Sequence, residues 1–440
     1  MLKESISGVR GIVGDGLDPK IIVEYCAAFS KILPEGPIIL GRDSRPHGEP
    51  ITALVASTLR LAGRNIIDIG IQATPTVEVV TERTDAAGGI IVTASHNPIQ
   101  WNALKFLKGD GMFLDQKDFD ALRAEMKAAP EWAPHNEVGN YQFLENAEQY
   151  HLDAIIWLPW LDGETIRNAR FKVVLDSNCG TGSIALLPLL EKLGCEVVSV
   201  GCNPDGNFLH TPEPRPENLS TLEKIVRENG ADIGLATDPD ADRLSLVVET
   251  GVAISEEYTL AIGAAEVANF MSGPIVVNLS TSAMIESIGR PVIRTSVGEI
   301  NVSTKMLEIG SPVGGEGNGG LIVPACHPGR DAALATAVIL HRMARTGKKL
   351  SELVAEFPTF TMIKERIDIR IEYDRLEKLL REEFSPKSVD TTDGVRIVID
   401  SGWLHVRASN TEPIIRIIVE AESSKQAKSI VERTRKILGA

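Results

Sequence analysis

The sequence predicts an α/β protein with three repeated α/β domains that have mixed sheets, plus a C-terminal α+β domain, all around a central cleft. Three observations predict this class. The chain has 440 residues, too many for one hydrophobic core. Three stretches repeat the order strand, polar turn, helix, strand, and near residue 359 the order changes to strand, helix, three strands, helix. We expect domains at 1–150, 151–250, 251–362 and 363–440.

Each repeated unit begins on an apolar run and continues into a helical stretch. The expected strands are 37–43, 66–69, 172–176, 196–200, 274–279 and 291–294, with helices at 50–62, from 183 to 193 and up to 288. The C-terminal unit has expected strands at 367–371, 395–399, 403–407 and 414–420 and helices at 376–384 and 425–438. Residues 129–160 show no clean period and are expected to form a linker ending in a short helix.

The composition limits the possible partners. With 45 Lys and Arg against 60 Asp and Glu, the net charge of -15 argues against nucleic acid or an anionic membrane as the main partner. No apolar run is long enough to span a bilayer, so we expect a cytoplasmic protein that binds small molecules, as a monomer or homodimer. The five scattered cysteines form no CxxC pair, which argues against zinc ribbons and disulfide frameworks.

Three polar loops each follow an apolar strand. They are TASHNP at 93–98, TDPDAD at 237–242 and GEGNGG at 315–320. Because α/β sheets bind ligands beyond the carboxyl ends of their strands, we expect these loops to share one cleft. A fourth glycine-rich turn, at 179–182, lacks the third glycine and the acidic residue of a dinucleotide-binding motif.

The first loop places the hydroxyl of Ser95 at a rigid strand end, beside His96. A simple helix cap is the alternative reading for a serine in such a loop. Lys105, on the expected return strand, can act as a base if partly buried, or can form an ordinary surface ion pair.

The second loop alternates three carboxylates, Asp238, Asp240 and Asp242. On an extended loop they can converge on one hard cation, and few ligands on a loop stiffened by proline favour magnesium. A calcium EF-hand loop is excluded, because Arg243 occupies the place where the turn needs glycine. Solvated charges remain the alternative. Arg243 can neutralise a phosphate oxygen or pair with Asp242.

The remaining motifs suit a phosphorylated sugar. Glu316 and Asn318 stand between glycines, where they can exchange hydrogen bonds with hydroxyls, although a flexible turn is an alternative. The run RASNTEP at 407–413 offers a guanidinium, hydroxyls and an amide as a phosphate clamp. Arg416 can join it, or lie on the surface of its strand.

TASHNP, D-x-D-x-D-R, GEGNGG and RASNTEP, in this order, resemble the α-D-phosphohexomutase superfamily over the whole chain. The runs at 7–11, 93–106 and 314–324 look most similar to phosphoglucosamine mutases and their phosphoglucomutase/phosphomannomutase relatives. The resemblance implies an isomerase that moves a phosphoryl group through a phosphoserine and a bisphosphate intermediate. The expected reaction converts glucosamine 6-phosphate to glucosamine 1-phosphate, with glucose or mannose phosphates as alternative substrates. A metal-dependent sugar phosphatase and a non-catalytic sugar-phosphate-binding protein are the rival functions.

The resemblance also implies a role for each site residue. Ser95 would carry the phosphoryl group and share one Mg²⁺ with the three aspartates, and a hexose 1,6-bisphosphate would act as activator. Lys105 would accept a proton. The remaining implied roles are phosphate support by Arg243, hydroxyl recognition by Glu316 and Asn318, binding of the second phosphate by Arg407, Ser409, Asn410 and Thr411, and lining of the site by His96 and Arg10.

The chain departs from the superfamily pattern at the sugar-binding loop. Many members have serine where Asn318 stands and histidine where Gly320 stands. The acid–base group often supplied by that histidine is therefore missing. Pro239 and Ala241 replace common glycines between the acids, which stiffens the loop without changing the carboxylate spacing.

Overall fold

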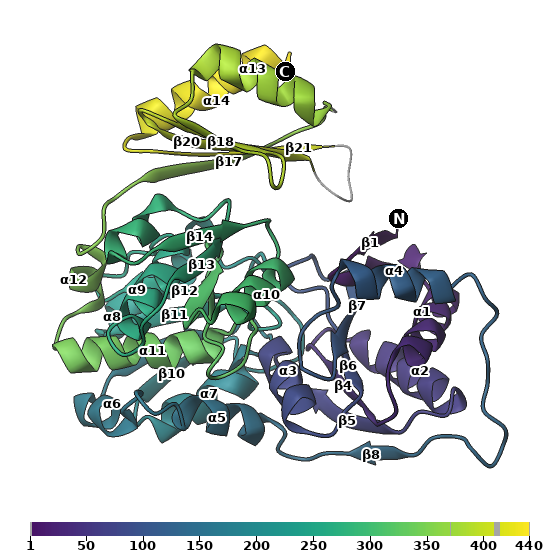
Figure 1. Cartoon of the computed structure of the whole chain (residues 1–440). Helices are drawn as coiled ribbons and strands as arrows, with labels where there is room; N and C mark the ends of the chain where they lie inside the picture. The colour runs from purple at the N-terminus through teal and green to yellow at the C-terminus, as the bar shows by residue number, and fades with distance from the viewer. Residues whose placement is uncertain (1, 370, 409–413, 440) are drawn as a thin grey trace.

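Runs of β-branched residues form the central strands of four sheets in the computed structural model, which describes residues 2–369, 371–408 and 414–439 (Figure 1). The first sheet has the order β1-β2-β7-β6-β4-β5-β8, with β3 beside β2. Its elements are β1 (Lys3–Ser5), β2 (Gly8–Val13), β3 (Gly16–Leu17), α1 (Pro19–Ile32), β4 (Ile38–Arg42), α2 (Gly48–Leu61), β5 (Ile66–Ile71), α3 (Thr74–Arg83), β6 (Gly88–Val92), β7 (Trp101–Lys108), α4 (Gln116–Glu125) and β8 (Tyr141–Phe143).

The second and third sheets have the same arrangement, β10-β9-β11-β12 and β14-β13-β15-β16. The second domain contains α5 (Glu148–Ile156), α6 (Gly163–Ala169), β9 (Lys172–Asp176), α7 (Gly182–Lys192), β10 (Glu196–Val200), a 3-10 helix (Pro216–Asn218), α8 (Ser220–Asn229), β11 (Ile233–Thr237) and β12 (Leu244–Val248). The third contains α9 (Glu257–Val267), β13 (Ile275–Asn278), a 3-10 helix (Ala283–Ile288), β14 (Val292–Thr295), α10 (Glu299–Ile309), β15 (Val313–Glu316), β16 (Gly320–Ile322), α11 (Ala332–Thr346) and α12 (Leu350–Val354).

One feature of the topology positions the site. In each of these three sheets a strand that pairs in parallel with its neighbour, β6, β11 or β15, leads through a short loop into an antiparallel partner, β7, β12 or β16. The three loops are the TASHNP, TDPDAD and GEGNGG segments. They therefore occupy equivalent places in three equivalent sheets, as the sequence predicted.

The C-terminal domain is a separate antiparallel sheet, β17-β21-β20-β19-β18, with two helices. Figure 1 shows both helices on the face turned away from the other domains, so the open face of the sheet is directed toward them. Its elements are β17 (Thr361–Ile367), α13 (Tyr373–Phe384), β18 (Ser388–Asp390), β19 (Val395–Ile399), β20 (Gly402–Ala408), β21 (Ile415–Ala421) and α14 (Ser424–Leu438).

The first strand of this domain lies earlier than the sequence predicted. We expected it at 367–371, but β17 spans Thr361–Ile367 and pairs with β21 from end to end. Charged residues interrupt the apolar pattern of β17, and its strand character comes from this long-range pairing. The sequence analysis also did not predict the short edge strands β8 and β18, whose strand character likewise comes from pairing with a neighbouring strand. The short helix expected at the end of the 129–160 linker is α5.

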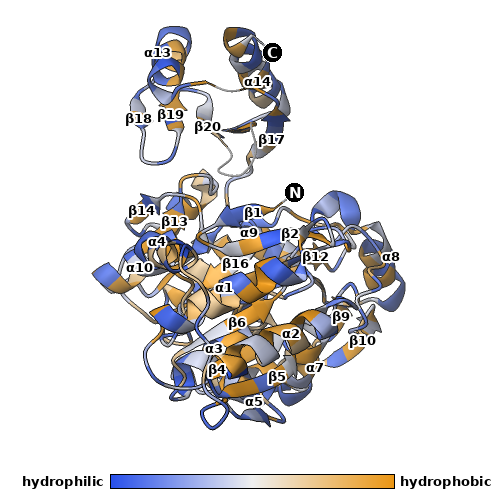
Figure 2. Cartoon of the chain, turned by 90° about the vertical axis from the view of Figure 1, so that its right-hand side faces the viewer, coloured by the Kyte–Doolittle hydropathy of each residue, from blue (hydrophilic) through white to orange (hydrophobic). Residues whose placement is uncertain are grey.

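The hydrophobic cores of the molecule differ in size and in the domains that they join. The largest cluster joins the second and third domains around α11, whereas the C-terminal domain has a core of its own. Figure 2 shows the apolar colour concentrated on inner strands such as β6. A few polar contacts attach the C-terminal domain to the third, including Ala283 N to Glu420 Oε1 at 2.9 Å and Val297 N to Asp393 Oδ2 at 3.0 Å. Polar contacts of this kind suit a domain that moves as one body.

Membrane-crossing helices are absent from the described residues, where no helix is both long and apolar enough to span a bilayer.

Candidate active site

All four domains contribute to one cleft of about 550 Å³. Its wall includes most of the residues that the sequence singled out, although they are up to four hundred positions apart. These lining residues are Arg10, Ser95, His96, Lys105, Arg243, Glu316, Asn318, Arg407 and Arg416. Asp238, Asp240 and Asp242 lie fully buried beneath this wall. Ser409, Asn410 and Thr411 fall outside the described residues.

Ser95 points its hydroxyl at the acidic loop. Its Oγ donates a 2.8 Å hydrogen bond to Asp238 Oδ2, which joins the first and second domains across the cleft. The serine has a φ of 48°, a left-handed conformation that non-glycine residues rarely adopt outside functional sites. Thr93 Oγ1 accepts the Ser95 N–H at 3.0 Å and donates to Asp43 Oδ2 at 2.6 Å. The loop is thus held in one conformation.

Arg45 is the second support of this loop, and the sequence analysis missed it. It is fully buried, and its Nη2 donates to the carbonyls of Ser95 (2.7 Å) and Asn97 (2.6 Å). Asp43 pairs with its guanidinium and balances the charge. The signal was present as the polar run Arg42 to Arg45 directly after an apolar strand, but nothing in the sequence linked it to a loop fifty residues later.

The three aspartates suit a metal ion. One carboxylate oxygen of each lies within 4.8 Å of the other two. Burial and the charges of Asp242 and Asp240 raise the pKa of Asp238 well above its usual value. Among the described residues, Oδ1 of Asp240 and Oδ1 of Asp242 have no hydrogen-bond partner. A hard cation would neutralise the repulsion and satisfy both oxygens, so the donor set fits magnesium.

The glycine-rich turn at 179–182 supports the acidic loop from behind. A Cβ on Gly180 would lie 2.7 Å from the Cα of Pro239. Thr181 N donates to the Pro239 carbonyl at 2.9 Å, and Thr181 Oγ1 donates to the same oxygen at 3.0 Å. The turn therefore packs against protein backbone, in agreement with the rejection of a nucleotide-binding turn.

Lys105 reaches the acidic loop from β7. Its Nζ lies 2.7 Å from Asp240 Oδ2, which also accepts the Thr74 hydroxyl at 2.8 Å. Burial disfavours the ammonium, but Asp240 and Asp242 outweigh it and raise the pKa of Lys105. In this structure Lys105 is a charged donor.

Three nitrogen-bearing side chains line the cleft near the serine loop and the acidic loop. His96 Nδ1 lies 3.3 Å from Ser95 Oγ, and burial together with Arg243 and Arg10 lowers the pKa of His96 well below its usual value. The imidazole is therefore neutral. Arg10 donates to Asn97 Oδ1 at 3.3 Å, and Arg243 Nε lies 3.6 Å from Asp242 Oδ1. Both guanidiniums line the cleft, where they can meet an anion.

The sugar-binding loop holds Glu316 rigidly. Its Oε1 accepts from Asn278 Nδ2 (2.8 Å) and Gly298 N (2.9 Å). Its Oε2 accepts from Arg330 Nη1 at 2.9 Å. Burial opposes ionisation, but these donors lower the pKa of Glu316, so it is an anion. The neighbouring Asn318 has a buried Oδ1 without a partner among the described residues.

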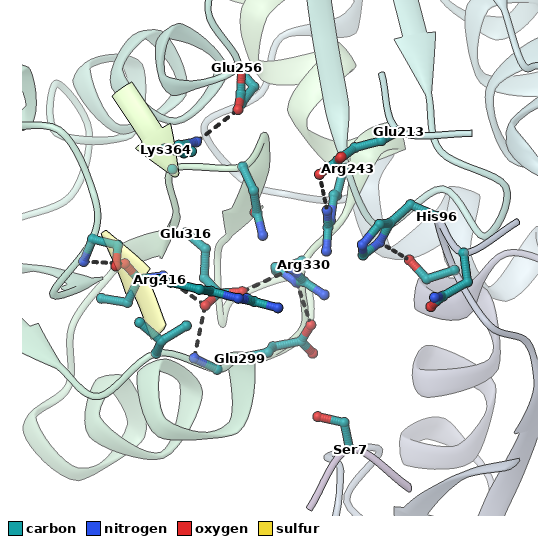
Figure 3. Close-up of a pocket in the computed structure, with 18 of the residues that line it drawn as sticks. Ser7, His96, Glu213, Arg243, Glu256, Glu299, Glu316, Arg330, Lys364 and Arg416 are labelled. Atoms are coloured by element: carbon teal, nitrogen blue, oxygen red, sulfur yellow. Dashed lines mark hydrogen bonds and ion pairs between the residues drawn. The ribbon is translucent and has the colours of Figure 1, made fainter. Parts of the chain in front are cut away.

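Arg330 is the centre of the site and was not singled out from the sequence. Its guanidinium binds three carboxylates: Asp242 Oδ2 at 2.6 Å, Glu299 Oε2 at 2.7 Å and Glu316 Oε2 at 2.9 Å. Figure 3 shows it between Glu316 and the serine loop, above Glu299. It thus joins the acidic loop of the second domain to the GEGNGG loop of the third.

The C-terminal domain adds positive charge to the opposite end of the cleft. Arg407 Nε pairs with Asp393 at 3.2 Å, and Lys364 Nζ pairs with Glu256 at 2.9 Å. Arg416 lines the same wall, and Figure 3 shows it beside Glu316, across the view from His96. The cleft therefore has the Ser95 hydroxyl and the acidic loop at one end and several cations at the other.

Comparisons with known proteins agree with this arrangement. Four models for phosphoglucomutase/phosphomannomutase match in order: alpha/beta/alpha domains I (2–132), II (149–251) and III (253–360), and the C-terminal domain (368–437). A phosphoglucomutase/phosphomannomutase of Thermococcus kodakarensis is 38% identical over 98% of this chain and 97% of its own. The chain belongs to the phosphoglucomutase/phosphomannomutase family.

Two further relatives of this family bear on the fold and the substrate. A probable phosphoglucosamine mutase of Methanopyrus kandleri is 36% identical over 96% of this chain and 95% of its own. The crystal structure of a putative phosphomannomutase from Thermus thermophilus has a TM-score of 0.85 at 26% identity, covering 100% of this chain and 99% of the other. The chain is thus a phosphohexomutase, and its similarity to these two relatives covers at least 96% of its length.

The structure explains why a glycine stands at position 320. A Cβ at this position would lie 2.3 Å from Cδ of Arg330 and 2.8 Å from its Cγ. The side chain of Arg330 occupies the space that a residue larger than glycine would need. The glycine at position 320 is therefore paired with this arginine.

We expect Gly320→Ala to displace Arg330 from its three carboxylates. Overpacking of this kind costs about 1–3 kcal/mol of stability, and turnover should fall by about tenfold or more because a ~1.4 kcal/mol loss of transition-state stabilisation is tenfold. Steady-state kinetics and thermal unfolding measure both. Gly48→Ala is the control, since its Cβ would meet only ordinary contacts beginning at 3.5 Å. Equal activity in the Gly320 variant and the wild type would contradict the packing argument.

Proposed function

We propose that this phosphohexomutase interconverts glucosamine 6-phosphate and glucosamine 1-phosphate through a phosphorylated Ser95 and an enclosed bisphosphate. The observation that best supports this proposal is the position of the Ser95 hydroxyl. Its Oγ lies 2.8 Å from Asp238 Oδ2 in the acidic loop, in the same cleft as Glu316 and Arg407. Phosphorylated Ser95 at one end of the cleft can pass its phosphoryl group to a sugar, while the cations at the other end hold the phosphate that the sugar already carries.

Asp238, Asp240 and Asp242 would hold one Mg²⁺ together with Ser95. When bound, the ion supplies positive charge where phosphoryl transfer concentrates negative charge. Arg243 and Arg10 complement that charge from the cleft side, and His96 stays neutral beside the serine. Lys105, as an ammonium, balances Asp240 and offers a hydrogen bond to the transferring group.

The sugar lies, in this proposal, between the two ends of the cleft. Glu316 accepts from hydroxyls and Asn318 offers its unpartnered Oδ1. Arg407 and Arg416, with the proposed contributions of Ser409, Asn410 and Thr411, bind the phosphate that is not reacting. A hexose 1,6-bisphosphate activator would load Ser95 by donating one of its phosphoryl groups to Ser95 Oγ and leaving as a hexose monophosphate.

Carboxylates on the wall of the cleft support an amino sugar. Glu213, Glu256, Glu257, Glu299 and Glu316 all line it. The ammonium group of a glucosamine phosphate can pair with such a carboxylate, whereas the hydroxyl of glucose or mannose cannot form an ion pair. The name of the Methanopyrus kandleri relative agrees with this preference.

The decisive assay supplies glucosamine, glucose and mannose 6-phosphates separately, with Mg²⁺ and with or without a hexose 1,6-bisphosphate. We expect formation of the 1-phosphate, stimulated by the bisphosphate, with the highest kcat/KM for glucosamine 6-phosphate. Release of inorganic phosphate as the main product would indicate a phosphatase. Binding without turnover of any of the three would indicate a sugar-phosphate-binding protein.

A further inference from the structure

Phosphoryl transfer to and from a sugar hydroxyl requires a group that takes up and returns the hydroxyl proton. The histidine that often supplies such a group in this superfamily is replaced by Gly320 here. The structure offers several titratable groups in the cleft, and most of them are unsuited to the task.

Three candidates are excluded by their contacts. Lys105 is an ammonium paired with Asp240. His96 contacts the serine itself, on the side of the phosphoryl donor rather than the sugar. Glu316 is an anion whose two oxygens already accept from Asn278, Gly298 and Arg330.

Glu257 also lines the cleft, but at the wrong end. Its carboxylate lies under Gly317, accepts from Ser282 N at 3.0 Å and lies 4.0 Å from Lys364 of the C-terminal domain. These contacts place it on the side of the phosphate that does not react. Glu78 is also buried near the site but does not line the cleft.

Glu213 and Glu256 line the cleft too, but they pair with Arg215 and with Lys364, each at 2.9 Å. Glu299 remains, and its position is well defined. It is the first residue of α10, lines the cleft and is 9% exposed. Arg330 Nε fixes Oε2 at 2.7 Å, and the same guanidinium binds the metal-loop residue Asp242 at 2.6 Å. Among the described residues no hydrogen bond to Oε1 of Glu299 is recorded, so this oxygen is left for a ligand.

Arg330 is itself held firmly by its neighbour Asp331. Oδ2 of Asp331 accepts from Nε2 of His151 at 2.7 Å and lies 3.2 Å from Nε2 of His327. Oδ1 of Asp331 accepts the N–H groups of Ala333 and Leu334 at the start of α11. A buried network from the second and third domains thus holds the segment that carries Arg330, and Arg330 in turn orients Glu299.

We propose that Glu299, oriented by Arg330, is the acid–base residue that serves the sugar hydroxyl in place of a side chain at position 320. This inference rests on the proposed mutase function. In the first half of the cycle, the hydroxyl oxygen bonds to the phosphorus of phosphorylated Ser95. The bond from that phosphorus to Ser95 Oγ breaks with its electron pair on Oγ, and the hydroxyl proton passes to Glu299.

The second half returns the proton. Ser95 Oγ attacks the other phosphate of the bisphosphate, and the bond from that phosphorus to the sugar oxygen breaks. The sugar oxygen leaves with the electron pair and takes the proton from Glu299. Both halves balance, and Glu299 ends the cycle in the state in which it began.

The surroundings give Glu299 a suitable affinity for the proton. Burial and Asp242 disfavour the anion, while Arg330 and Lys105 favour it, and the balance raises the pKa of Glu299 to about 7. Glu78 on α3 and Glu316 on β15 are the other titratable groups close by. A proton acceptor and donor works best when its pKa lies near the operating pH.

The test is Glu299→Gln, which keeps an oxygen for Arg330 but cannot exchange a proton. We expect kcat to fall about 10²–10³-fold with little change in KM. In the wild type, kcat/KM should rise with pH through a pKa of about 7, because the anion is the base. In the variant, the rise of kcat/KM through a pKa of about 7 should disappear. The rise near pH ~6, which comes from ionisation of the substrate phosphate, should remain. Glu299→Asp should restore part of both the rate and the rise that Glu299→Gln loses.

Glu308→Gln is the matched control, since Glu308 lies on the same helix in an exposed pair with Lys305. Wild-type kcat and an unchanged pH profile in Glu299→Gln would overturn the inference. If the glutamine variant does not fold, Glu299→Asp is the deciding variant. Full activity of Glu299→Asp with an unshifted pH profile of kcat/KM would then overturn the inference. Absence of mutase turnover in the wild type would instead refute the proposed function. An active wild type, an inactive Ser95→Ala and an unaffected Glu299→Gln would refute this inference alone.

Discussion

Ser95→Ala should abolish mutase turnover, with kcat reduced by at least ~10⁴-fold, the scale on which removal of a catalytic nucleophile acts. The expectation follows from the position of Oγ, 2.8 Å from Asp238 and directed into the acidic loop. Among the described residues that line the cleft, no other hydroxyl makes this contact. Without it the phosphoryl group has no acceptor on the protein, however well the sugar binds.

Mass spectrometry makes this prediction specific. Incubation with a hexose 1,6-bisphosphate and Mg²⁺ should add one phosphoryl group to the wild type and none to the variant. Ser57→Ala, at an exposed position on α2, is the control and should behave as the wild type does. Comparable phosphorylation of Ser95→Ala, or mutase activity close to the wild type, would show that another residue carries the group.

The sequence predicted the parts of the site that lie on strand-ending loops. TASHNP, TDPDAD and GEGNGG are local runs of polar residues after apolar strands, so both their chemistry and their place in the fold can be inferred from neighbouring residues. The repetition of one unit then implied that the loops meet. The cleft that contains Ser95, Arg243 and Glu316 has this origin.

The residues that the sequence did not reveal act through tertiary contacts. Arg45 supports a loop fifty positions away, and Arg330 joins Asp242, Glu299 and Glu316, which come from three separate segments. A buried arginine with distant partners has no local pattern. The same holds for β17, whose strand character depends on pairing with β21. Local periodicity cannot indicate an element that is stabilised only by its neighbours.

The apparent loss of a histidine at position 320 shows how such contacts change an interpretation. From sequence alone, Gly320 removes an acid–base group. In the structure, the glycine makes room for the aliphatic part of Arg330. The glycine in the loop and the arginine ten positions later are therefore a single structural unit.

Arg330→Met should be the most destabilising single substitution at the site. Arg330 is buried, and its removal leaves the carboxylates of Asp242, Glu299 and Glu316 without their shared cation. Breaking a buried ion pair costs about 3–5 kcal/mol, because the remaining charge is desolvated without compensation. We expect a loss of this size in the free energy of unfolding at pH 7, measured by denaturant titration followed by circular dichroism.

The pH dependence separates this charge effect from lost packing. Arg330 helps to lower the pKa of Glu316 below its value in the unfolded chain. A lowered carboxyl pKa contributes stability that is present above the unfolded pKa and is lost as the pH falls through the folded pKa. The difference between wild type and variant should therefore be large at pH 7 and smaller at pH ~4, near the unfolded pKa of glutamate. Lys305→Met, which breaks an exposed pair in the same domain, should cost less than ~1 kcal/mol at either pH. A loss in Arg330→Met that is small, or equal at both pH values, would mean that the guanidinium contributes mainly through packing.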